Sequence, residues 1–110
     1  MKNRAINALV EMGMPADIKG FQYIVDAMCL FEEKEWRNGK TTVLYCKIGE
    51  INGVKPQNVE RSIRHALEAT LAKGNLEAVK KYLSFDRTTN GSQLHLLYIR
   101  LKQQEEEGEA

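Results

Sequence analysis

The chain has 110 residues, 43% of them hydrophobic and 28% charged, and its formal net charge is +1. This length corresponds to one domain, and the composition is that of an ordinary globular protein. No stretch approaches the roughly 18 apolar residues that a membrane span needs, and the N-terminus lacks the apolar run and cleavage site of a signal peptide.

Apolar residues recur at helical spacing along the chain, with no strand-like alternation, so we expect an all-α domain of six helices. The first helix covers about residues 3–12 and ends where Gly13 supplies a C-cap and Pro15 cannot continue the helix. Asp17 is then a candidate N-cap for a second helix, which runs to about residue 35. The broad apolar face of this second helix predicts that it is the central one.

The third and fourth predicted helices are joined by a short connection. The third covers about residues 42–51, and the fourth runs from Pro56, which suits a first turn, to about residue 73. About four residues containing Gly53 join them, which is the spacing of a helix-turn-helix. Gly49 lies where close approach of the two helices requires a small residue. Many helical corners share this spacing and bind nothing, so the spacing alone leaves DNA binding open.

A fifth helix is predicted over about residues 75–83 and a sixth over about 92–104, with a loop between them. Residues 1–104 would form the domain, and residues 105–110 a disordered acidic tail, because negative charge opposes the C-terminal end of a helix dipole. Four of the 15 acidic residues lie in this tail, and without them 11 acids face 16 bases, which gives +5. A moderately basic body is compatible with phosphate binding.

The cysteines and histidines match no catalytic or metal-binding signature. Cys29 and Cys46 have neither metal nor redox spacing, so we expect two reduced core thiols in a cytoplasmic protein. His65 and His95 fall on different predicted helices and lack a matched nucleophile, a carboxylate pair or a glycine-rich phosphate loop. We therefore expect no enzyme activity, no metal and no cofactor.

The fourth predicted helix separates apolar from charged residues around its axis. At about 100° per residue, one arc collects the apolar side chains Val59, Ile63, Ala66, Leu67 and Leu71. The opposite arc presents Glu60, Arg61 and Arg64 on the N-terminal half, the part of a recognition helix that enters the major groove. Each arginine can donate to guanine O6 and N7, and the glutamate can accept from cytosine N4. The alternative interpretation is a solvated face with ion pairs at i,i+4 spacing.

A DNA-binding corner also needs contacts to the phosphate backbone. The helix starts supply six candidates: Lys40, Thr41, Thr42, Lys55, Gln57 and Asn58. Backbone amides at a helix N-terminus can point at a phosphate, and such contacts position the protein without specifying sequence. Ordinary capping and loop solvation is the alternative for each of them, and either threonine could cap the third helix.

Two elements, GMPADIKGF and VERSIRHALE, carry a family resemblance, which covers about residues 4–104. They resemble the C-terminal effector domain of the master response regulator of sporulation initiation in endospore-forming Firmicutes. The resemblance implies a six-helix domain with a helix-turn-helix that binds double-stranded DNA at a short TGTCGAA-type box. It implies base reading by Glu60, Arg61 and Arg64, and it places His65 beside them as a secondary contact.

The resemblance also implies partners. In the family two such domains bind tandem boxes and touch through their last helices, which would place Leu94, Leu97, Tyr98 and Leu101 at a DNA-dependent homodimer contact, although the residues alone indicate core. A receiver domain precedes this domain in the full regulator, so the chain is expected to be either an excised domain or a standalone protein. The last helix and the KPQN segment before the fourth helix depart from the family pattern. A second hypothesis is therefore a receiver-less protein-interaction module that modulates other regulators.

Overall fold

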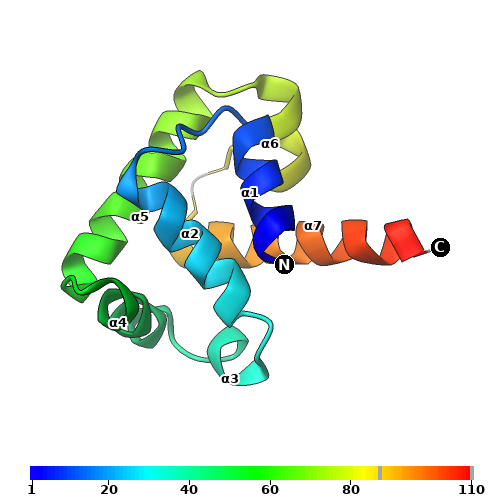
Figure 1. The fold of residues 1–110 in the computed structure, drawn as a ribbon. Helices are drawn as coiled ribbons and strands as arrows, with labels where there is room; N and C mark the ends of the chain where they lie inside the picture. Colours follow the sequence, from blue (N-terminus) through cyan, green and yellow to red (C-terminus); the bar gives the residue numbers. More distant parts are fainter. Residues whose placement is uncertain (87, 110) are drawn as a thin grey trace.

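The computed structural model describes residues 1–86 and 88–109, and within them the chain forms seven helices and no strand. The helices are α1 (Lys2–Glu11), α2 (Lys19–Leu30), α3 (Lys34–Arg37), α4 (Thr41–Asn52), α5 (Pro56–Lys73), α6 (Leu76–Tyr82) and α7 (Asn90–Glu109). The predicted all-α class is confirmed. Figure 1 shows α2 crossing the middle of the molecule, α1 and α6 together at one end, and α4 at the other.

The core forms around α2, as the sequence predicted. This helix packs most extensively against α5 and also contacts α1, α4 and α7. Gly20 permits the approach to α5, because a Cβ at this position would lie 2.3 Å from the Ser62 carbonyl oxygen and 2.6 Å from the Ala66 Cβ. Phe21, the first large apolar side chain of α2, directly follows the glycine that lets the backbones of α2 and α5 come close.

The predicted second helix was wrong at both ends. Its N-cap is Ile18 rather than Asp17, and it stops at Leu30 rather than near residue 35. Two acids, Glu32 and Glu33, follow its negative end and disfavour continuation. The Glu33 carboxylate instead accepts a hydrogen bond from the Trp36 indole N–H at 3.0 Å. Glu33 is the N-cap of a separate short helix, α3, so the described residues form seven helices rather than the expected six.

The last helix differs from its predicted end at residue 104. In the structure α7 continues to Glu109, so residues 105–109 of the expected disordered tail are helical, and residue 110 lies outside the described residues. Lys102 forms an ion pair at i,i+3 spacing with Glu105, 2.9 Å apart, which supports the extra turn against the unfavourable dipole interaction. Figure 1 shows this end of α7 projecting away from the other helices.

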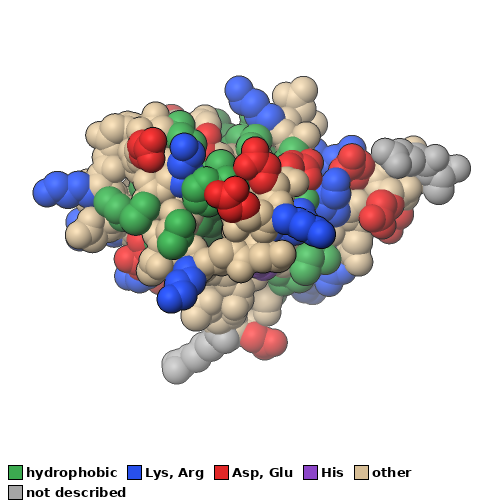
Figure 2. All heavy atoms as spheres, turned by 90° about the horizontal axis from the view of Figure 1, so that it is seen from below, with side chains coloured by type: hydrophobic (Ala, Val, Ile, Leu, Met, Phe, Trp, Pro, Cys, Tyr) green, Lys and Arg blue, Asp and Glu red, His purple; other side chains and the backbone are tan. Residues whose placement is uncertain are grey.

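Several apolar side chains and both thiols lie on the surface. Cys29 and Cys46 are exposed, so the expectation of core thiols was wrong: each sits at the edge of the buried stripe of its helix, outside the packed face. On α4, Val43 is 50% exposed and Ile51 54% exposed. Figure 2 shows hydrophobic, basic and acidic side chains interspersed on the face seen from below. No helix among the described residues has the length and apolarity to span a membrane.

Candidate nucleic-acid interface

A three-residue turn over residues 53–55 joins α4 to α5. Gly53 ends α4 in the left-handed conformation, with φ of 69°, and the Val54 N–H then donates to the Gly49 carbonyl at 2.9 Å. A Cβ on Gly49 would lie 2.5 Å from the Val54 carbonyl oxygen. The turn thus folds back tightly over the last turn of α4, which requires the small residue that the sequence predicted at position 49.

The two faces of α5 follow the predicted arcs. Val59, Ile63, Ala66 and Leu67 are buried in the core, and Leu71 is half-buried beside it. Arg61, Arg64 and His65 are exposed, and Glu60 is half-buried at the edge between the two faces. Because the buried face fixes the rotation of the helix, both arginines point to solvent from its N-terminal half.

Glu60 and Arg64 form an ion pair at i,i+4 spacing on the exposed face of α5. An exposed pair of this kind contributes about 0.2–0.5 kcal/mol to an isolated helix, so it orients the two side chains more than it stabilises the domain. Within the described part of the chain, Arg61 and His65 take part in no ion pair. The alternative ion-pair interpretation therefore holds for one pair and leaves the Arg61 guanidinium and the His65 imidazole facing solvent.

An open groove of about 720 Å³ runs alongside this face of α5. The first half of α4, the part of α5 from Pro56 to Glu68, and the residues from Thr88 to Gly91 around the start of α7 line it. Of the predicted contacts, it brings together five: Thr41, Thr42, Gln57, Glu60 and Arg64.

The remaining predicted contacts do not line this groove: Arg61 and His65 are exposed further along α5, and the others lie around the two helix starts. Lys55 and Asn58 border a second hollow, next to the turn after α4. Lys40 is exposed at the N-cap of α4, so neither Thr41 nor Thr42 caps that helix as the sequence predicted. The predicted phosphate contacts are thus divided between the two sides of the α5 N-terminus.

Two groups in the groove had no signal in the sequence. Tyr45 on α4 is 7% exposed, and burial raises the pKa of its phenol, an effect that the Asn90 side chain opposes. Asn90, the first residue of α7, donates from its side-chain amide to the Glu60 carbonyl oxygen at 3.3 Å. Only the packing of three helices brings these residues together.

The four residues expected at a dimer contact belong to the core of the domain itself. Leu94, Leu97 and Leu101 are 0% exposed and Tyr98 is 5% exposed. They occupy the side of α7 that packs onto α2, α5 and α6. Their burial within a single chain agrees with the core role that the residues alone indicate, and the dimer contact implied by the resemblance stays a prediction. On its outer side α7 exposes Ile99, at 52% exposure.

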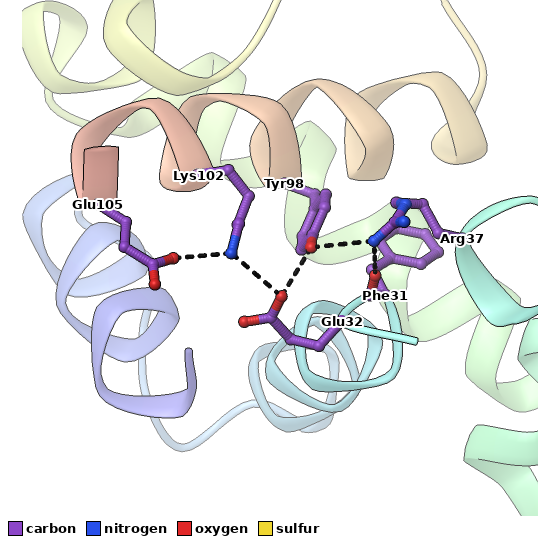
Figure 3. Close-up of polar contacts among 6 residues, drawn as sticks. All are labelled: Phe31, Glu32, Arg37, Tyr98, Lys102 and Glu105. Carbon is purple, nitrogen blue, oxygen red and sulfur yellow. Dashed lines mark hydrogen bonds and ion pairs between the residues drawn. The ribbon is translucent and has the colours of Figure 1, made fainter. Parts of the chain in front are cut away.

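Polar contacts hold the same helix against α2 and α3 (Figure 3). The Tyr98 hydroxyl donates to the Glu32 carboxylate at 2.7 Å and accepts from Arg37 at 3.3 Å. Arg37 also donates to the Phe31 carbonyl oxygen at 2.9 Å. Lys102 lies 3.5 Å from the Glu32 carboxylate. This network fixes the middle of α7 against the end of α2.

The titratable residues of the described chain do not assemble into a metal site. No group of three His, Cys, Asp or Glu side chains among the described residues is placed to hold an ion. His95 lies far from His65 along the chain, and its ring nitrogens contact the backbone carbonyls of Gly91, at 2.8 Å, and Arg37, at 2.9 Å. The role of His95 is thus to join α7 to α3.

A comparison with models of protein families gives a match over nearly the whole chain. The family model described as the C terminal of the sporulation initiation factor Spo0A matches residues 5–101. The match therefore includes α4, α5 and the connection between them, and reaches far into α7.

Proposed function

This chain belongs to the Spo0A C-terminal family of DNA-binding effector domains of sporulation response regulators, and we propose on that premise that its α5 reads a short TGTCGAA-type box. In this proposal α4 and α5 are the helix-turn-helix, and α5 is the recognition helix in the major groove of double-stranded DNA. The domain then regulates transcription in the cytoplasm, in sporulation or a related stationary-phase programme.

One observation carries the proposal: two exposed guanidinium groups project from the N-terminal half of a helix whose opposite face is buried. Arg61 and Arg64 can each donate two hydrogen bonds to guanine O6 and N7. Glu60 can accept from cytosine N4, and its pairing with Arg64 offsets the cost of bringing a carboxylate near phosphates. His65, exposed on the same face, is a secondary contact.

The helix starts supply the contacts to the DNA backbone. Thr41 and Thr42 at the start of α4 lie beside the groove, and Lys40 precedes them. Lys55, Gln57 and Asn58 lie around the start of α5. Contacts of this kind set the register of the protein on the duplex and contribute affinity that depends on salt.

On tandem boxes we propose a DNA-dependent homodimer. Because the four predicted side chains of α7 are buried, we propose that the contact uses the exposed side of that helix, which carries Ile99. A preceding receiver domain would control such a dimer in a longer regulator.

Fluorescence anisotropy tests the proposed function. A labelled duplex with the TGTCGAA-type box is compared with a scrambled duplex of the same composition over a series of salt concentrations. We expect tighter binding to the box, since each mismatched base pair costs about 1–3 kcal/mol, and weaker binding of both duplexes as salt rises. Equal affinity for the two duplexes would contradict specific recognition. Binding to neither would favour the alternative, a module that acts on other regulators.

A further inference from the structure

The start of α7 touches both helices of the proposed helix-turn-helix. Asn90 is half-buried at the groove, and its amide donates to the backbone carbonyl oxygen of Glu60 on α5 at 3.3 Å. Tyr45 of α4, which is 7% exposed, lines the same groove as Asn90. The start of α7 therefore contacts α5 and lies beside α4 at the level of the proposed base-reading residues.

The neighbouring glycine shows how closely α7 and α4 approach. A Cβ on Gly91 would lie 2.6 Å from the Thr41 hydroxyl oxygen and 3.5 Å from the Thr41 Cβ. From the other side, the His95 ring joins the Gly91 carbonyl to the Arg37 carbonyl. The first turn of α7 is thus held between α3 and α4, and these contacts fix the position of the Asn90 backbone.

Base reading makes strict demands on the placement of α5. A binding constellation must be held within about 0.5 Å of its productive geometry by supporting contacts. Val59 and Ile63 fix the rotation of α5 from its buried side. Asn90 contacts the backbone of Glu60, whose side chain pairs with Arg64, on the side of α5 that faces the groove.

We propose that Asn90 is a positioning residue for sequence recognition: it holds the α5 backbone at Glu60 so that Glu60 and Arg64 meet the base edges in register. This inference rests on the proposed function and deepens it. It assigns part of the specificity to α7, outside the helix-turn-helix.

The test compares Asn90→Leu with wild type on the box and the scrambled duplex, together with thermal unfolding. Leucine keeps the size of the side chain and removes the amide donor. We expect affinity for the box to fall about tenfold, the equivalent of about 1.4 kcal/mol. Affinity for the scrambled duplex and the salt slope should stay unchanged, because no charge is altered. Asn90→Ala serves as a second variant in case leucine perturbs folding.

Ser92→Ala is the matched control. Ser92 is exposed in the same turn of α7, and its side chain contacts Thr89 rather than α5. Its substitution should leave discrimination at the wild-type level. Equal losses on both duplexes for the Asn90 variants would overturn the positioning role in favour of a direct backbone contact. A lower unfolding temperature with unchanged discrimination would also overturn it, since Asn90 would then act on stability alone. Wild-type protein that cannot tell the two duplexes apart would instead refute the proposed function itself.

Discussion

At the residue scale, the exposed face of α5 combines the Glu60–Arg64 ion pair with Arg61, which takes part in no ion pair within the described residues. The Glu60–Arg64 pair holds the arginine in place while leaving its side chain 54% exposed. An ion pair in the free protein and a base contact in the complex are therefore compatible, since guanidinium has five donors in a planar fork. Lys55 differs, because it is the exposed last residue of the turn and can offer only a point charge.

Arg64→Lys separates charge from geometry. Lysine keeps the positive charge but loses the bidentate fork, so we expect a loss of about 1–3 kcal/mol on the box, relaxed discrimination at one guanine, and an unchanged salt slope. Lys55→Ala should weaken both duplexes about equally and lower the salt slope by about one. Anisotropy titrations with single-base variants of the box measure both effects. An equal loss from Arg64→Lys on all duplexes would place Arg64 on a phosphate rather than a base.

At the element scale, the connection between α4 and α5 imposes two different demands on two glycines. Gly53 has positive φ but open space around its Cα, and Gly49 has ordinary helical φ but no space for a Cβ. The first demand is conformational and the second is steric. Both follow from a turn of three residues that sets the angle between α4 and α5.

Gly49→Ala should destabilise the domain more than Gly53→Ala. The left-handed conformation costs an alanine about 1–2 kcal/mol at position 53. At position 49 the new methyl group meets backbone rather than a mobile side chain, and we expect about 3 kcal/mol, the upper end of overpacking costs. Urea unfolding of the two variants and of wild type measures the difference. Equal free energies of unfolding would show that the α4–α5 connection yields readily, contrary to a close-packed turn.

At the scale of the whole molecule, charge is distributed unevenly along the chain. The overall charge of +1 combines a more basic body with the acids Glu105, Glu106, Glu107 and Glu109. These acids occupy the projecting end of α7, at the opposite end of that helix from the groove. Their field opposes the approach of any nucleic acid, whatever its sequence.

Removal of residues 105–110 should raise affinity for both duplexes by the same factor. The truncation removes four acids and changes the formal net charge from +1 to +5. The gain should shrink at high salt, because the screening length falls to about 3 Å at 1 M. A full-length variant with the four glutamates changed to glutamine is the matched control, since it alters charge while keeping chain length. A gain confined to the box would contradict a purely electrostatic effect.

The sequence by itself determined the all-α class, the two faces of α5, the small residue at Gly49 and the family elements, because helical periodicity and turn chemistry are local properties. It did not determine where α2 ends or that α7 continues to Glu109. Neighbouring charges and ion pairs change the free energy of a helix end by amounts comparable to the differences in helix propensity between residues. Only the tertiary structure decided that both cysteines face solvent and that Asn90 reaches the Glu60 backbone. The last contact joins residues 30 positions apart, and such contacts depend on how whole helices pack.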